Sequence, residues 1–133
     1  MLRLEIVTPE KRVLDAEVDS VTVMTATGEA GILPNHAPLI SSLKPGILTY
    51  TSKGNSDKLA ISGGFVEVNG NSVSVLADTA STADEIDLAQ ARTDKEVAEK
   101  AFAAVASGSV EDTESARDQI DAANVRIQLA SGK

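Results

Sequence analysis

Cysteine and tryptophan are absent from the 133-residue sequence, which also holds only one tyrosine and two phenylalanines. Without cysteine the chain can form neither a disulfide nor a thiolate metal site, and thiol catalysis is excluded. Basic residues are scarce too, because 12 Lys and Arg stand against 20 Asp and Glu, for a net charge of −8. So few cations and aromatic rings leave little to hold a phosphate backbone or to stack on bases, and we expect no nucleic-acid binding.

Long apolar runs are also missing, since no stretch approaches the roughly 18 residues that a membrane-spanning helix needs. The N-terminal stretch MLRLEIVTPE alternates in polarity and carries acids, which is typical of neither a signal peptide nor an Arg-rich transit peptide. We therefore expect a soluble chain with no direct bilayer insertion. The length is typical of one domain, or of a small domain with an appendage.

Residues 1–84 have the period-2 polarity of half-buried strands, separated by turns rich in Gly, Pro and Asn. The clearest turn is Asn69-Gly70-Asn71, where Asn and Gly tolerate positive φ. Many short strands with no helix between them predict an antiparallel β-sandwich or barrel. The predicted strands include Leu2-Leu4-Ile6, Val21-Val23, residues 47–51, Leu59-Ile61, residues 65–68 and Val73-Val75.

Residues 85–133 have the sequence pattern of helices instead, with no proline and many Ala, Glu, Asp and Gln. Asp84 is placed as an N-cap with Asp87 in the first turn, and Gly108 and Ser109 predict a stop and a second N-cap. Apolar spacings of three and four predict two amphipathic helices, and the short connection predicts an antiparallel hairpin. The two predicted apolar faces are Leu88, Ala91, Lys95, Ala98, Phe102 and Val105, and Ala116, Ile120, Ala123, Ile127 and Ala130. A seam so rich in alanine buries little area, so we expect a movable hairpin that depends on docking.

The stretch GEAGILPNHAPL, residues 28–39, carries the only histidine of the chain, His36, in what the sequence presents as a rigid apolar loop. A catalytic His36 would need a nucleophile and an orienting acid, but the nearby Ser41, Ser42 and Glu29 stand at no recognisable catalytic spacing. Pro34 and Pro38 stiffen the loop, and Leu33 and its apolar neighbours would favour a partner surface. Docking is therefore favoured over catalysis, and no metal site is expected. The pair Gly63-Gly64 is interpreted as a bend in the sheet and not as a phosphate cradle.

Taken in order, GEAGILPNHAPL, LKPGIL, ISGGFVEVNGNSVSVLADTA and DEIDLAQAR resemble the epsilon subunit family of the bacterial and chloroplast F-type ATP synthases, the counterpart of mitochondrial delta. The resemblance covers essentially the whole chain. It implies a flattened antiparallel β-sandwich of about ten strands followed by a two-helix hairpin, in a non-catalytic subunit of the rotor stalk. The implied partners are the gamma subunit, the ring of c subunits and, when the hairpin is extended, the alpha/beta catalytic head.

The same resemblance assigns the stretch around residues 28–39 to contact with the c ring. Glu29 and His36 are carried over as ring contacts, together with Pro34 and Leu33 beside them. They would couple rotation and not catalyse a reaction. Pro34 and Pro38 suit such a role because they restrict the conformations of the loop before it docks. A docking loop with little conformational freedom loses less conformational entropy on binding.

In some members of the family the folded hairpin binds ATP, through an [IL]DxxRA sequence on its first helix and arginines on its second. Here Ile86, Asp87 and Ala91 match that sequence, whereas Gln90 replaces its arginine and Arg92 follows two positions late. On the second helix Arg126 matches one arginine and Ala122 stands in place of another. The resemblance therefore implies no bound cofactor, or at most weak ATP binding.

Two other functions compete with the rotor-stalk hypothesis. One is a free-standing β-sandwich module that binds another protein through residues 28–39, and the other is a small hydrolase built on His36. Neither explains why the second half of the chain has the family's order of motifs as well. For location, we expect a peripheral protein on the cytoplasmic face of a bacterial plasma membrane, or alternatively on the stromal or cytosolic side of a thylakoid.

Overall fold

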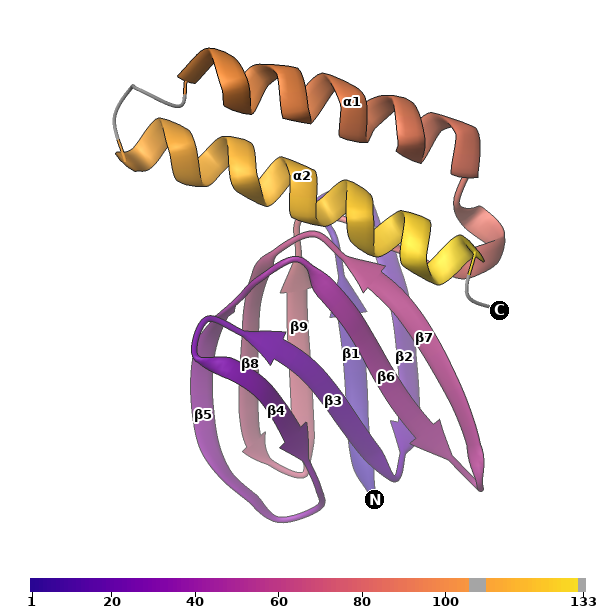
Figure 1. Cartoon of the computed structure of the whole chain (residues 1–133). Helices are drawn as coiled ribbons and strands as arrows, with labels where there is room; N and C mark the ends of the chain where they lie inside the picture. Colours follow the sequence, from indigo (N-terminus) through magenta and orange to yellow (C-terminus); the bar gives the residue numbers. More distant parts are fainter. Residues whose placement is uncertain (106–109, 132–133) are drawn as a thin grey trace.

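A computed structural model describes residues 1–105 and 110–131, and it divides the chain into a β-sandwich and a helical hairpin stacked on one end of it (Figure 1). The sandwich is one sheet of ten strands, curled so that its two halves pack face to face. The strands are β1 Leu2–Val7, β2 Arg12–Val18, β3 Ser20–Thr25, β4 Gly28–Ile32, β5 His36–Leu43, β6 Gly46–Ser52, β7 Asn55–Ile61, β8 Gly64–Gly70, β9 Ser72–Ala77 and β10 Ala80–Ser81. The predicted sandwich of about ten strands is confirmed.

Strand order in the sheet is β10-β7-β6-β3-β5-β8-β9-β1-β2, with β4 paired to β3. Every pairing is antiparallel except one, because β1 lies parallel to β9 with Leu4 opposite Val73. The predicted turn at Asn69-Gly70-Asn71 joins β8 to β9, and Gly70, the last residue of β8, has φ 61°. Lys53 and Gly54, between β6 and β7, have φ 52° and 83°. These positive φ values suit the tight turns that join twisted antiparallel strands.

The core lies between the two halves of the curled sheet and is almost wholly aliphatic. Nine apolar residues of the predicted strands are buried: Leu2, Leu4, Ile6, Val21, Val23, Leu59, Ile61, Val73 and Val75. They are joined in one cluster by Val18, Ile32, Leu43, Leu48, Val66, Val68 and Ala77. Burying this many Val, Ile and Leu side chains, each worth roughly 1.5–3 kcal/mol, makes the sandwich the stable part of the molecule.

A bend between β7 and β8 is built on Gly63 and Gly64, whose φ values are 137° and 117°. The Ser62 N–H donates to the Thr79 carbonyl and the Asp78 N–H to the Gly63 carbonyl, so this bend is hydrogen-bonded to the segment that leads from β9 to the hairpin. The interpretation of this glycine pair as a bend in the sheet is confirmed.

The hairpin consists of α1, Leu88–Val105, and α2, Val110–Ser131, which run antiparallel (Figure 1). Its seam is alanine, as predicted: Ala91, Ala98, Ala116 and Ala123 are all buried. Helix α2 lies between α1 and the sandwich and contacts β6 and β7. The predicted stop at Gly108 and cap at Ser109 lie outside the described residues.

Helix α1 begins at Leu88 and not at residue 85, and the predicted N-cap is wrong. Asp87 is the cap, because its Oδ1 accepts from the Gln90 backbone N–H at 3.1 Å. Asp84 lies instead in a separate 3-10 turn, Ala83–Glu85, followed by an extended Ile86. That turn forms because Thr82 and Glu85 make a capping box of their own, which the T-x-x-E pattern of the sequence indicates.

Candidate functional site

The sequence predicts a loop for residues 28–39, and this prediction is wrong. The stretch consists of parts of two strands joined by a short turn. Strand β4 ends at Ile32, residues 33–35 form the turn, and β5 begins at His36. Asn35 takes up a left-handed conformation with φ 65°, which Asn tolerates better than most residues. Its backbone N–H donates to Oδ1 of Asn71 at 2.8 Å, so the turn is anchored to the neighbouring β8–β9 turn.

The structure brings Leu33, Pro34 and His36 together at this turn. Leu33 and Pro34 are exposed, and the Leu33 side chain keeps 62% of its surface open to solvent. His36 is half-buried opposite Gly70, and its Nδ1 donates to the Ala37 carbonyl at 2.6 Å. A shift in the pairing register between His36 and Leu39 puts Pro38 in a bulge, where its missing N–H costs no ladder hydrogen bond.

Glu29 lies apart from those three residues, near the opposite end of β4. It precedes Leu33 by four positions, which at the usual rise of a strand is roughly 13 Å. The turn before it is tightly made, since buried Thr25 donates its hydroxyl to the Gly28 carbonyl at 2.6 Å. The four predicted contacts therefore follow the length of β4 and the start of β5, both held by hydrogen-bonded turns.

A second surface on the sandwich was missed by the sequence analysis. Ile40, Phe65 and Leu76 are 73%, 58% and 58% exposed on the outer face of β5, β8 and β9. Phe65 lies directly opposite Leu76, and Ile40 is opposite Glu67, two residues along β8. We call these three residues the outer patch. They are apolar residues at positions where the alternation of each strand calls for a polar, solvent-facing residue. Such apolar residues at outward positions are the signal by which the sequence indicates this surface.

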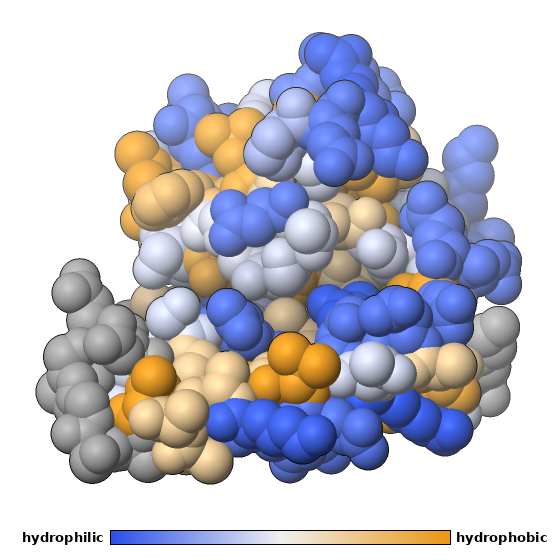
Figure 2. All heavy atoms as spheres, turned by 90° about the horizontal axis from the view of Figure 1, so that it is seen from above, coloured by the Kyte–Doolittle hydropathy of each residue, from blue (hydrophilic) through white to orange (hydrophobic). Residues whose placement is uncertain are grey.

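The face that carries the hairpin differs from the outer patch. Seen from the hairpin side, charged and polar side chains alternate with small apolar groups over the two helices (Figure 2). Helix α2 docks on the sandwich through Leu129, which is 8% exposed and lines a groove together with β2, β6 and β7. The predicted apolar face of the second helix does not include Leu129. That face follows the spacing of residues directed toward α1 and ends at Ala130, the position after Leu129.

At the base of the hairpin, the Thr82 backbone N–H and hydroxyl both donate to Glu85 Oε1, at 2.9 and 3.1 Å. These donors, the backbone N–H foremost, lower the pKa of the Glu85 carboxyl below its ordinary value of 4.5. Because the pKa of Glu85 is lower in the folded than in the unfolded chain, the ionised carboxylate contributes to the free energy of unfolding. This contribution is complete above pH 4.5 and is lost as the pH falls through the pKa of the folded state.

We predict that Thr82→Ala raises the pKa of Glu85 toward its ordinary value, because one of its two donors is removed. The loss of stability at neutral pH should stay below about 1 kcal/mol, as for a solvent-exposed cap. Titration of the Glu85 carboxyl carbon by NMR measures the shift. Thr93→Ala, which removes a hydroxyl bonded to the Ala89 carbonyl on α1, should leave the Glu85 titration unchanged. An equal shift in both variants would contradict the assignment.

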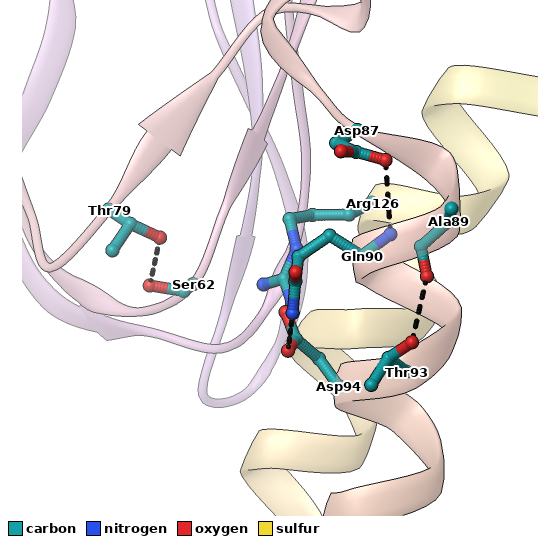
Figure 3. Close-up of polar contacts among 8 residues, drawn as sticks. All are labelled: Ser62, Thr79, Asp87, Ala89, Gln90, Thr93, Asp94 and Arg126. Carbon is teal, nitrogen blue, oxygen red and sulfur yellow. Dashed lines mark hydrogen bonds and ion pairs between the residues drawn. The ribbon is translucent and has the colours of Figure 1, made fainter.

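The residues predicted for a weak nucleotide site lie near the same base but do not form one cluster. Ile86 is half-buried, Asp87 caps α1, and Ala91 is buried in the seam. Arg126 on α2 is bonded to Asp94 on α1, with Gln90 on the other carboxylate oxygen (Figure 3). Arg92 is exposed and lies two positions before Asp94 on α1. Two positions correspond to about 200° around a helix, so Arg92 points away from the side on which Asp94 meets Arg126.

Among the described residues, no group of three or more His, Cys, Asp or Glu side chains is placed to hold a metal ion. Neither of the helices, over the part of the chain that the structure describes, has an apolar stretch of the length and hydropathy that spanning a bilayer requires.

Comparison with known proteins gives a consistent result. Residues 1–83 match the family model of the β-sandwich domain of the ATP synthase delta/epsilon chain. An ATP synthase epsilon chain from Desulfitobacterium hafniense (strain Y51) is 52% identical over 97 residues, which cover 73% of this chain and 74% of that one. Another, from Herpetosiphon aurantiacus, is 46% identical over 129 residues, or 97% and 93% of the two chains.

Solved structures agree with this. A chain of the Euglena gracilis mitochondrial ATP synthase OSCP/F1/c-ring assembly superposes with a TM-score of 0.76 at 26% identity, over 93% of this chain and 78% of that one. A chain of the Tetrahymena thermophila mitochondrial ATP synthase central stalk/c-ring structure has a TM-score of 0.64 at 16% identity, over 98% and 96%, and supports the fold alone.

Proposed function

This chain belongs to the delta/epsilon family of ATP synthase chains, and we propose that it works as the non-catalytic epsilon subunit of the rotor stalk, coupling rotation of the c ring to the catalytic head. The observation that carries this proposal is the 46% identity to an epsilon chain along nearly the whole length of both chains, sandwich and hairpin together. A free-standing sandwich module would not require the hairpin to be retained in this way.

For the c ring we propose the surface formed by Glu29 on β4 and by Leu33, Pro34 and His36 at the β4–β5 turn. This proposal is supported by the resemblance to the family and by the rigidity of the surface. The turn is tied by Asn35 to Asn71, and the preceding turn by Thr25 to Gly28, so the surface is stiff before it meets a partner. A stiff contact loses little conformational entropy on docking and transmits torque with little bending.

Site-directed photo-cross-linking tests this surface. Because the chain has no cysteine, a single Leu33→Cys carries one benzophenone label, and Ser56→Cys on β7 gives a matched exposed control. In the assembled synthase, we expect the label at residue 33 to form a product with the c subunit in the majority of cross-linked chains, identified by mass spectrometry, and the label at residue 56 to form none. Equal cross-linking from both positions, or none from residue 33, would contradict the assignment.

For the gamma subunit we propose the outer patch as the docking surface. Three large apolar side chains exposed on one face of a sheet gain free energy by being covered, at about 25 cal/mol for each Å² of apolar surface. The patch lies on the part of the chain that the family model covers, residues 1–83. In this arrangement the sandwich would use separate surfaces for the ring and for gamma.

The hairpin would be the regulatory part, folded on the sandwich here and able to reach the alpha/beta head when extended. Nucleotide binding to the folded form would be weak, because Arg92 points away from Arg126 and the Arg126 guanidinium is already engaged by Asp94. In a bacterium such as those whose epsilon chains it matches, the subunit would lie on the cytoplasmic face of the plasma membrane, as a peripheral member of the complex.

A further inference from the structure

The two helices of the hairpin are joined at their base by a chain of polar contacts (Figure 3). Arg126 Nη2 on α2 donates to Asp94 Oδ2 on α1 at 3.0 Å. Gln90, one turn before Asp94, donates from Nε2 to the other carboxylate oxygen at 2.9 Å. We propose that Asp94, held by Gln90, is a built-in anion for Arg126, which latches the hairpin shut without any bound ligand.

The surroundings of this latch (Gln90, Asp94 and Arg126) make a single ion pair matter. Elsewhere the buried seam between the helices consists largely of alanine methyl groups, and each gives roughly the 0.8 kcal/mol of one buried carbon. Two further contacts join the helices: the Arg117 guanidinium lies 5.6 Å from the centre of the Phe102 ring, and the Thr113 hydroxyl donates to the Val105 carbonyl at 3.4 Å. The Arg126 side chain is 26% exposed and that of Asp94 43%, so the pair is only partly screened by water. Among the described residues it is the one ion pair between α1 and α2.

The latch also accounts for where an external anion would act. An anionic ligand at the hairpin base would have to displace Asp94 from Arg126, since Arg92 points away and cannot supply a second cation there. Removing the negative charge of Asp94 should therefore do two things at once. It should loosen the closed hairpin, and it should free Arg126 to accept an anion from solution.

The first effect can be measured on the isolated chain, independently of assembly into a synthase. Spin labels on Ala89→Cys and Asn124→Cys, exposed positions on α1 and α2, report the distance between the helices by electron double resonance. In this labelled background we expect Asp94→Asn to raise the ratio of open to closed hairpins about fivefold, the upper end for a partly exposed ion pair. Glu96→Gln, the same charge change at an exposed position of α1 about 200° away, should change it less than about 1.5-fold.

A double-mutant cycle separates the pair from general effects on the helices. Arg126→Gln should open the hairpin as much as Asp94→Asn does, and the double variant should open it little further, because both remove the same interaction. Fully additive effects of the two substitutions would overturn the proposal, as would equal responses to Asp94→Asn and Glu96→Gln.

The second effect uses inorganic pyrophosphate as the probe, at millimolar concentration and against chloride of equal ionic strength. The parent chain should keep the same open-to-closed ratio, because Asp94 already occupies Arg126. The Asp94→Asn chain should close again by at least twofold, and Asp94→Asn with Arg126→Gln should not respond. Closure of the parent chain by pyrophosphate, or no response of Asp94→Asn, would overturn the assignment of Asp94 as the resident anion.

Discussion

Gly64→Ala is expected to remove most of the stability of the β-sandwich. A Cβ at this position would lie 2.0 Å from the Leu76 carbonyl oxygen and 2.9 Å from the Ala77 Cα, both backbone atoms of the paired strand β9. The φ of 117° is also one that alanine avoids. Strain and overpacking each cost about 1–3 kcal/mol, and a clash with backbone lies at the high end, so a loss of roughly 4 kcal/mol or more is expected.

Two other glycines separate the causes of that loss. Gly31→Ala places a methyl group in open space with no unusual φ, and it should change the free energy of unfolding by less than about 0.5 kcal/mol. Gly28→Ala meets no atom within 4 Å but has φ 127°, so it should fall between the other two. Urea unfolding followed by circular dichroism measures all three. A Gly64→Ala chain as stable as Gly31→Ala would show that β8 and β9 can move apart freely.

Phe65→Glu is expected to abolish most of the affinity for the gamma subunit while leaving the chain folded. The side chain is 58% exposed on the outer patch, so its replacement removes little of the core. In a complex, however, the new carboxylate would be buried beside Leu76 with no cation among the patch residues. A large aromatic residue at the centre of an interface is typically worth 2 kcal/mol or more, and the added charge should bring the loss to about 100-fold in Kd.

The matched control is Val97→Glu on α1, where a valine with 62% of its surface exposed receives the same acid outside the outer patch. Its affinity for gamma should change less than about threefold in a titration of purified subunits followed by calorimetry. Unfolding curves of both variants should overlie that of the parent chain to within about 1 kcal/mol. If Phe65→Glu bound gamma as tightly as Val97→Glu, gamma would not dock on this patch.

The sequence predicted the sandwich well because burial imposes a strict period of two on strands that have one wet face. Leu2, Leu4 and Ile6 could only be placed inward together, and one register satisfies all of them. The alanine seam followed from helical spacing in the same way. The start of α1 could not be read from periodicity, because Asp84 and Asp87 are both acceptable caps and the competing box of Thr82 and Glu85 decided between them.

The candidate sites were less predictable because they depend on contacts between distant segments. Nothing near Asn35 in the sequence indicates that Asn71 will hold it, since that contact exists only once β5 and β8 are paired. Asp94 and Arg126 are likewise 32 positions apart and meet only in the closed hairpin. The outer patch was accessible in principle, through apolar residues on the wet phase of β5, β8 and β9, but its assembly required the register of all three strands.

The parallel pairing of β1 with β9 sets the order in which a growing chain can fold. Leu4 must wait for Val73, so the N-terminal strand has no partner on that side until nearly the whole sandwich has left the ribosome. Pairings of such long sequence separation carry a large loop-closure entropy and are slow to form. The helices are synthesised after the strands, and α2 then meets β6 and β7, which are adjacent in sequence and can pair early.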